Sequence, residues 1–225
     1  MLLHIEKVLD SAAVSRMRAR LDGAEWIDGR ETVGPQGARV KRNQQLADAS
    51  PARMELGREV LAACARHSGF HAATLPVRIL PPRFNRYANG GHYGAHIDGA
   101  VMALADGSQL RSDIACTLFL ADPESYDGGE LVVEDTYGEH EVKLPAGDAI
   151  VYPASSLHRV EPVTRGVRVA AFFWIQSLVR DEAQRRMLLQ LDTAVRKLTA
   201  TGADAEVVKQ LSGVYHNLLR QWAET

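Results

Sequence analysis

Two residue types that bind metals stand close together in residues 87–101, which read YANGGHYGAHIDGAV. His96 and Asp98 flank Ile97, and on a β-strand residues i and i+2 point to the same face, so an imidazole and a carboxylate can reach one point. A third ligand must come from elsewhere, and His158 in PASSLHRVEPV is the best candidate. Two histidines and one carboxylate on one side of an ion form the triad typical of non-haem Fe(II) oxygenases.

The His-x-Asp pair has an ordinary explanation as well. Most such pairs are a surface histidine beside a turn-forming aspartate. The distal half of the chain favours the metal site, because His158 follows LPAGDAIVYPASS, where a turn leads into a short apolar strand.

Arg168 is the next residue with a chemical signal, since it lies in the strongly apolar segment GVRVAAFFWIQ. A strand there would be largely buried, and a buried arginine is rarely left unpaired because stranding its charge is costly. An internal Asp or Glu is the usual partner. The alternative is a ligand carboxylate, which the planar guanidinium can bind with two hydrogen bonds.

Several segments together resemble the PiuC-like branch of the bacterial PKHD-type hydroxylases, and more broadly the prolyl-hydroxylase group of Fe(II)/2-oxoglutarate dioxygenases. They are HIDGAV, RSDIACTLFLADP, YDGGELVVE, LPAGDAIVYPASSLHRVEPVTRG and VRVAAFFWIQSLVRD. The resemblance covers residues 76–181, and the C-terminal helical tail also fits this branch.

The resemblance implies roles for particular residues. Iron would be bound by His96, Asp98 and His158, and the far carboxylate of 2-oxoglutarate by Arg168. Tyr87 fits the tyrosine that assists the cosubstrate in this family.

Two further residues are additional candidates for the pocket. Tyr93 precedes the His-x-Asp pair by a few positions. Phe119 stands where some eukaryotic members carry a tyrosine, so that hydroxyl contact is expected to be missing.

The implied reaction is a hydroxylation that uses O2 and Fe(II), converts 2-oxoglutarate to succinate and CO2, and relies on ascorbate as a reductant. The substrate stays open between a prolyl or other protein residue, a free amino acid and a small metabolite. PiuC-like proteins are associated with iron uptake, which suggests a siderophore-linked target.

Two other functions remain open. One is a non-catalytic cupin-like module that binds a metal or small molecule. The other keeps the fold and uses Zn or Mn for hydrolysis or isomerisation. Arg168 discriminates against a mere metal scaffold, which has no need of a buried cation near its ligands.

Composition sets outer bounds. A chain of 225 residues is long enough for one domain with a full core and a helical appendage. Its net charge of -2 gives no general reason to expect a nucleic-acid partner. Cys64 and Cys116 are expected to be buried thiols in a reducing compartment. The N-terminus does not resemble a signal peptide and no long apolar run is present, so we expect a cytoplasmic protein without a membrane span.

The expected fold class is α+β with a mainly β core, a double-stranded β-helix (jelly roll) of cupin-like type. Short alternating segments with Gly and Pro turns predict its strands. They cover residues 75–80, 83–87, 92–97, 114–120, 130–134, 139–143, 149–152 and 168–176. We expect a domain over 1–178 with its catalytic core at 76–178, and a helical extension over 179–225.

Helices flank this core. A short N-terminal strand precedes a helix capped by Asp10 or Ser11 that ends near Leu21, and the Ser50-Pro51 pair predicts a second helix to about Ser68.

Two segments between the helices and strands are harder to interpret. Residues 28–50 are expected to be irregular with a strand near 38–43, and their basic cluster Arg39, Lys41 and Arg42 is usually a solvated edge. The resemblance leaves a substrate role open as well, because this segment often lies near the mouth of the site in the family. Residues 99–113 form a long loop that we expect to be a lid or a substrate wall.

The tail contains two amphipathic helical patterns, over 181–198 and from about 203. Leu211, Tyr215, Leu218 and Trp222 share one face of the second helix. Because a jelly roll closes its own core, we expect this face to support a homo-oligomer.

Overall fold

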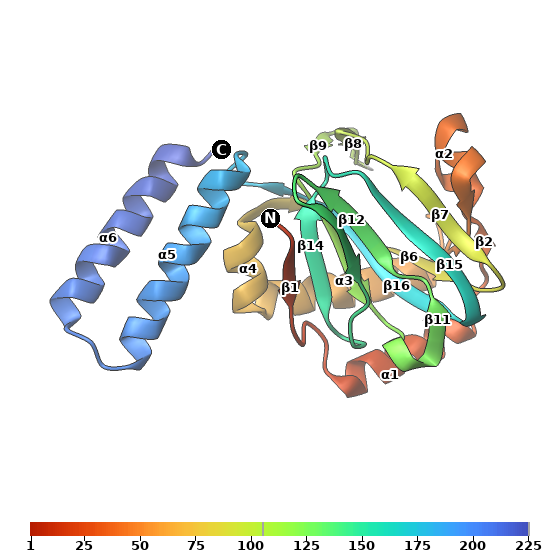
Figure 1. Ribbon diagram of the computed structural model, residues 1–225, viewed down its shortest axis with the longest axis horizontal. Helices are drawn as coiled ribbons and strands as arrows, with labels where there is room; N and C mark the ends of the chain where they lie inside the picture. Colours follow the sequence, from red (N-terminus) through yellow and green to blue (C-terminus); the bar gives the residue numbers. More distant parts are fainter. Residues whose placement is uncertain (105, 225) are drawn as a thin grey trace.

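The computed structural model describes residues 1–104 and 106–224, and two antiparallel β-sheets form its centre (Figure 1). The larger sheet has eight strands in the order β1-β14-β10-β16-β6-β4-β2, with β5 paired to β16. In chain order these strands are β1 (Leu3–Ile5), β2 (Ile27–Asp28), β4 (Gln44–Gln45), β5 (Pro76–Ile79), β6 (Arg83–Tyr87), β10 (Ile114–Phe119), β14 (Ala149–Pro153) and β16 (Arg168–Ser177).

The smaller sheet has six strands in the order β13-β12-β15-β7-β3, with β11 paired to β15. These are β3 (Lys41–Arg42), β7 (Gly91–His96), β11 (Tyr126–Gly128), β12 (Leu131–Asp135), β13 (Gly138–Val142) and β15 (His158–Gly166). A separate hairpin consists of β8 (Val101–Ala103) and β9 (Gln109–Arg111).

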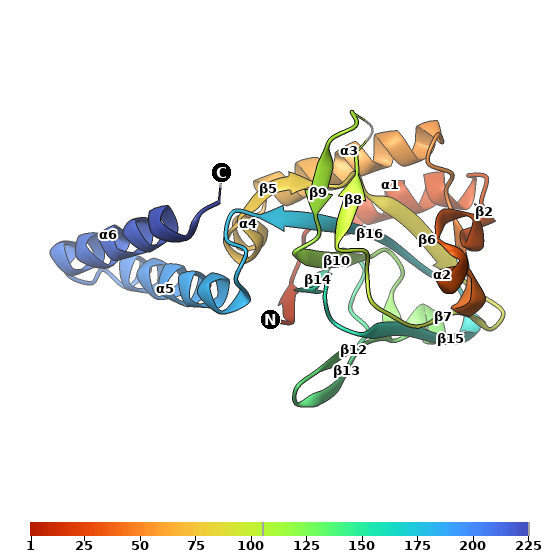
Figure 2. The ribbon, with the colours of Figure 1, turned by 90° about the horizontal axis from the view of Figure 1, so that it is seen from above.

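Helices cover the outer face of the larger sheet, as Figure 2 shows for α1 and α3. The helices are α1 (Ser11–Asp22), α2 (Pro35–Val40), α3 (Pro51–Arg66), α4 (Ser68–Thr74), α5 (Glu182–Ala200) and α6 (Ala205–Trp222), with 3-10 turns η1 (Gly29–Thr32) and η2 (Pro123–Ser125). Asp10 and Ser50 cap α1 and α3 through their side chains, as predicted.

Strand β16 lies at the centre of the larger sheet, and its alternation decides which side chains enter the interior. Val169, Phe173 and Ile175 pack in the core between the sheet and the helices. Residues of the opposite parity, including Arg168 and Trp174, face the space between the two sheets and line a cavity there. The period of two therefore directs Arg168 and Trp174 towards the cavity and most of the core residues towards the helices, although Phe173 also contributes to the cavity lining.

The predicted jelly roll with N-terminal helices and a C-terminal helical pair is confirmed, but details differ. Strand β15 was missing from the expected strands. The first half of the strand expected at 38–43 belongs to helix α2, because Gly34 and Pro35 start a helical turn, and the strand is confined to Lys41–Arg42. The helix expected to reach Ser68 breaks at His67, whose side chain caps α4. Residues 99–113, expected to be a loop, contain the β8–β9 hairpin. Cys64 and Cys116 are free and buried, as expected.

The C-terminal pair α5–α6 projects from one side of the β core (Figures 1 and 2). Its base is a small apolar cluster in which Leu75, Val179 and Leu188 are buried and Trp222 packs against them. The backbone N–H of Glu224 donates to the carbonyl of Leu178 at 2.8 Å, so the end of the tail returns to its start. No helix in residues 1–104 and 106–224 has the length and apolar character needed to cross a membrane.

Candidate metal centre

A cavity of about 360 Å³ opens between the two sheets, and all of the predicted site residues except Phe119 line it. The smaller sheet contributes His96 from β7 and His158 from β15, which are direct partners in the strand register. The larger sheet contributes Arg168 and Trp174 from β16. Asp98 lies just beyond the end of β7, in the turn that leads to the β8–β9 hairpin.

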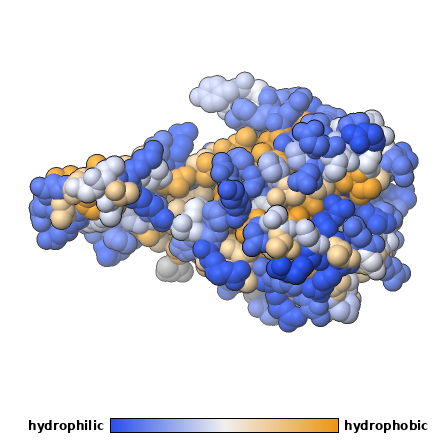
Figure 3. Space-filling model, turned by 90° about the horizontal axis from the view of Figure 1, so that it is seen from below, coloured by the Kyte–Doolittle hydropathy of each residue, from blue (hydrophilic) through white to orange (hydrophobic). Residues whose placement is uncertain are grey.

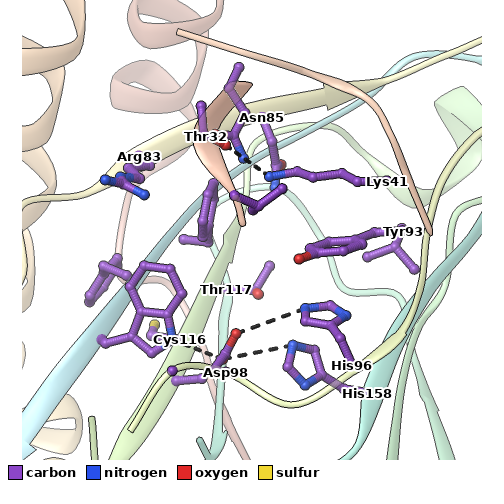
Figure 4. Close-up of a pocket in the computed structure, with 18 of the residues that line it drawn as sticks. Thr32, Lys41, Arg83, Asn85, Tyr93, His96, Asp98, Cys116, Thr117 and His158 are labelled. Carbon is purple, nitrogen blue, oxygen red and sulfur yellow. Dashed lines mark hydrogen bonds and ion pairs between the residues drawn. The ribbon is translucent and has the colours of Figure 1, made fainter. Parts of the chain in front are cut away.

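His96, Asp98 and His158 form one cluster, with one ligand atom of each lying within 4.8 Å of the others. Asp98 Oδ1 lies 3.8 Å from His96 Nε2, and Asp98 Oδ2 lies 3.8 Å from His158 Nε2 (Figure 4). The pairing of β7 with β15 thus brings together residues from distant parts of the chain. Ile97, between His96 and Asp98, is 60% exposed.

The orientation of both imidazole rings is fixed by the backbone. His96 Nδ1 lies 2.8 Å from the carbonyl oxygen of Gly94, and His158 Nδ1 lies 3.0 Å from that of Ser156. When Nδ1 donates to these carbonyls, Nε2 keeps its lone pair for a cation.

Burial shapes the charge of the cluster. Burial, reinforced by the neighbouring His158, lowers the pKa of His96 to about 4, so this ring is neutral at neutral pH. Burial also raises the pKa of the Asp98 carboxyl. A cation bound beside the neutral ring of His96 would stabilise the charged form of this desolvated carboxylate. Two histidine nitrogens and one carboxylate are a donor set that fits Fe(II).

Arg168 lies in the same cavity and is only 1% exposed. Its guanidinium carbon lies 5.3 Å from the ring centre of Tyr87 and 5.2 Å from that of Phe119. Among the residues that the structure describes, none forms an ion pair with Arg168, and its Nε has no hydrogen-bond partner. The internal Asp or Glu that would explain a buried arginine is therefore not found in the described chain.

The three remaining candidates lie in different environments. Tyr87 is buried, lines the cavity and accepts a hydrogen bond from Asn85 Nδ2 at 3.4 Å. Tyr93 stacks on His96 with ring centres 3.6 Å apart. Phe119 is fully buried beneath Arg168 in the core between the sheets, where it supports the guanidinium.

Sequence reasoning missed one side chain of this cavity, that of Trp174, and did not single out a second, that of Lys41. The indole Nε1 of Trp174 donates to Asp98 Oδ2 at 2.8 Å. Its position on the same strand face as Arg168 could have indicated it. Lys41 is nearly fully buried, whereas Arg39 and Arg42 of the same basic cluster are exposed. No feature of the cluster's composition distinguishes Lys41.

The turn before β12 also shapes the site. Gly129 has a φ of +70°, and a Cβ there would lie 3.1 Å from Arg168 Cδ. The glycine therefore leaves room for the arginine side chain.

Comparisons with known proteins match the two parts of the chain separately. Residues 82–176 match the model of the 2OG-Fe(II) oxygenase superfamily, and residues 182–224 match that of the PKHD-type hydroxylase C-terminal domain. A PKHD-type hydroxylase of Stenotrophomonas maltophilia is 64% identical over 224 residues, covering 100% of both chains. One from Xylella fastidiosa is 60% identical over 230 residues, again with 100% of both chains covered.

Solved structures share the fold at low sequence identity. A Pseudomonas putida prolyl-4-hydroxylase is 21% identical with a TM-score of 0.51, covering 78% of this chain and 92% of its own. HygX from Streptomyces hygroscopicus, solved with nickel, 2-oxoglutarate and hygromycin B, is 18% identical with a TM-score of 0.51, covering 76% and 81%.

Proposed function

Since this chain belongs to the PKHD-type hydroxylases and contains a 2OG-Fe(II) oxygenase domain, we propose that His96, Asp98 and His158 hold its Fe(II). The family makes the protein a 2-oxoglutarate-dependent hydroxylase. The assignment of residues rests on one observation. The described chain contains a His-Asp-His cluster in the same cavity as a buried, unpaired guanidinium.

Bound Fe(II) supplies the activation of O2, which oxidises the substrate while 2-oxoglutarate loses CO2 to become succinate. The protein's own contribution is to fix the ligands. The carbonyls of Gly94 and Ser156 hold the two rings, and the indole of Trp174 holds one carboxylate oxygen of Asp98. Because such outer contacts already orient the ligands, their side chains need to move little when the metal binds.

Arg168 is the residue we assign to the far carboxylate of 2-oxoglutarate. A guanidinium offers two parallel N–H donors to a carboxylate, and burial strengthens that ion pair. Tyr87, whose ring lies beside the guanidinium, is placed to contact the same cosubstrate. Phe119 supports Arg168 from below without a hydroxyl group to offer.

Other parts of the function are proposals from the resemblance or, for the location, from the sequence composition. They are ascorbate as the reductant, a cytoplasmic location and a substrate connected with iron uptake. The cavity wall formed by Met102 and Ala103 of β8 supports a substrate-contacting role for the hairpin.

Anaerobic titration separates the two binding functions. Equilibrium dialysis measures Fe(II) binding. We expect Asp98→Ala to abolish it, and His96→Ala and His158→Ala to weaken it by the same amount as each other. The visible absorption band of the Fe(II)·2-oxoglutarate complex should need about tenfold or more cosubstrate in Arg168→Lys, because the charge is kept but the two-donor fork is lost.

Matched controls exist for both. His140→Ala removes an exposed histidine of β13, and Arg165→Ala removes an exposed arginine that pairs with Asp127. Both should behave as the unchanged protein. Full iron affinity in His158→Ala would refute the triad. If the intact protein formed no succinate from 2-oxoglutarate with Fe(II) and O2, a non-catalytic module would be favoured.

A further inference from the structure

Lys41 is a buried cation without an anionic partner in the described chain. It is 4% exposed and lines the cavity. Its Nζ donates to Thr32 Oγ1 at 3.0 Å, and no carboxylate of the described residues lies within ion-pair distance. An ammonium group has three N–H donors, so two are left over. A buried charge without a counter-ion is costly, and natural sites compensate it with an anion.

The backbone holds Lys41 at this place by close packing. Lys41 pairs with Tyr93 across the β3–β7 ladder. A Cβ at Gly94 would lie 3.0 Å from Val40 Cβ, and one at Gly91 would lie 3.0 Å from the carbonyl oxygen of Arg42. Glycines on β7 therefore let the segment on both sides of the lysine approach the strand, which directs the lysine side chain over the cavity.

Lys41 occupies a different part of the cavity from the proposed iron and cosubstrate groups. The ring of Tyr93 lies between Lys41 and His96 (Figure 4). Lys41 Nζ lies 5.0 Å from the centre of that ring, and the same ring stacks on His96. The far carboxylate of 2-oxoglutarate is already assigned to Arg168, and the opposite end of that molecule would be held at the metal. Lys41 is left for a third anionic group.

The other charges of the cavity do not neutralise Lys41. Arg83 also lines the cavity, but it is itself a cation, and its guanidinium is paired with Asp48 at 2.9 Å. Asp98 is assigned to the metal. Near these charges, Met102, Phe172 and Trp174 form apolar wall. The site thus combines one free ammonium with a hydrophobic surface.

We propose that Lys41 is a specificity residue that binds an anionic oxygen group, most simply a carboxylate, of the substrate to be hydroxylated. This inference rests on the proposed function, because it assumes that iron and 2-oxoglutarate occupy their assigned places. The substrate class is then an organic acid with an apolar body.

Benzoate and benzamide are suitable probes, since they share an apolar ring and differ in charge. The anaerobic Fe(II)·2-oxoglutarate complex is titrated with each, and changes of its visible band give the affinity. We expect benzoate to bind about tenfold more tightly than benzamide, the effect of one charge-assisted hydrogen bond.

Variants connect this preference to the lysine. Lys41→Met and Lys41→Gln should abolish the preference for benzoate and leave the 2-oxoglutarate titration within about twofold. Lys41→Arg should keep the preference for benzoate, because the positive charge remains. Arg42→Met, which removes the exposed neighbouring charge, should have no effect.

The possible outcomes distinguish the two proposals. A band that never forms with 2-oxoglutarate refutes the proposed function, and this inference with it. A normal band with no benzoate preference in the intact protein refutes this inference alone. So does a preference that survives in Lys41→Gln. A loss of 2-oxoglutarate affinity of about tenfold in Lys41→Gln would assign the lysine to the cosubstrate instead.

Discussion

The two carboxylate oxygens of Asp98 have different surroundings. Oδ1 faces His96, whereas Oδ2 faces His158 and accepts the hydrogen bond of Trp174 Nε1. Trp174→Phe keeps an aromatic ring and removes that donor. Loss of such an outer contact costs about 10–100-fold in metal affinity, so we expect weaker Fe(II) binding by equilibrium dialysis.

Trp26→Phe is the matched control, because its indole donates to the Leu21 carbonyl far from the proposed metal ligands. It should bind Fe(II) normally. If Trp174→Phe bound iron as tightly as the intact protein, the indole would have only a packing role.

Lys41 gives the site a pH dependence. Burial, followed by the charge of Arg83, lowers the pKa of Lys41 to about 8, while Asp28 and Asp98 act in the opposite direction. The ammonium is therefore present below that pH and lost above it. We expect benzoate affinity to be constant below pH 8 and to fall at higher pH, with the bound anion delaying the fall.

Lys41→Arg should remove this pH dependence, because a guanidinium stays charged throughout the range. Titrations from neutral pH upward check both proteins. An affinity that stayed flat to a pH of about 10, near the ordinary lysine value, would show that Lys41 does not set it.

Individual site residues could be predicted from the sequence where their type and spacing are typical of a metal or anion site. The His-x-Asp pair, the distant His158 and Arg168 within an apolar segment were all visible, and the structure brings them to one cavity. Lys41 and Trp174 were not, since their importance depends on neighbours from other elements.

The backbone conformation of the turn between β11 and β12 affects the shape of the cavity. Gly129→Ala would impose a side chain on a φ of +70° and push its Cβ to 2.7 Å from Val163 Cγ2. Strain of this backbone kind costs about 1–3 kcal/mol, and overpacking adds about 1–3 kcal/mol. We expect lower unfolding free energy in denaturant titrations and weaker 2-oxoglutarate binding.

Gly107→Ala separates the two causes, because Gly107 has a φ of +81° with nothing near its Cβ position. It should show the backbone cost alone. Equal losses of stability in both variants would mean that the crowding around Arg168 has no energetic effect.

Elements were predictable to the extent that their apolar residues follow a regular period. Most core strands met that condition. Strand β15 did not, because Pro162 interrupts it and register shifts separate its buried residues His158, Val160 and Val163. The short segment before β3 was mistaken for strand, since local composition does not reveal that Gly34 and Pro35 begin a helix.

At the scale of the whole molecule, the tail remains the basis of a predicted homo-oligomer. The face of the second tail helix that was expected to support it is used within the chain instead, because Tyr215, Leu218 and Trp222 pack on the apolar junction at the base of the tail. The exposed apolar residues of the tail lie elsewhere. Met187, Val207 and Val214 keep exposed fractions of 47%, 48% and 49%. Figure 3 shows hydrophobic surface along the projecting arm.

We therefore expect light scattering to report an oligomer, most simply a dimer with self-complementary surfaces. The double change Val207→Glu/Val214→Glu should shift it towards the monomer, because charges would oppose burial of that face. Val77→Glu, at an exposed apolar residue of β5, is the control. A monomeric intact protein would contradict the expectation.

The hydrogen bond from Glu224 to Leu178 joins the end of the tail to its start, so both helices are attached to the β core at one place, the base of the tail. Helix α6 has 18 residues, and at about 1.5 Å per residue the turn around Gly202 lies about 27 Å from that base. A small rotation at the base would therefore become a displacement several times larger at the turn. A spin label at Gly202, where open space surrounds the Cβ position, would therefore report small rotations of the tail at the junction as large displacements.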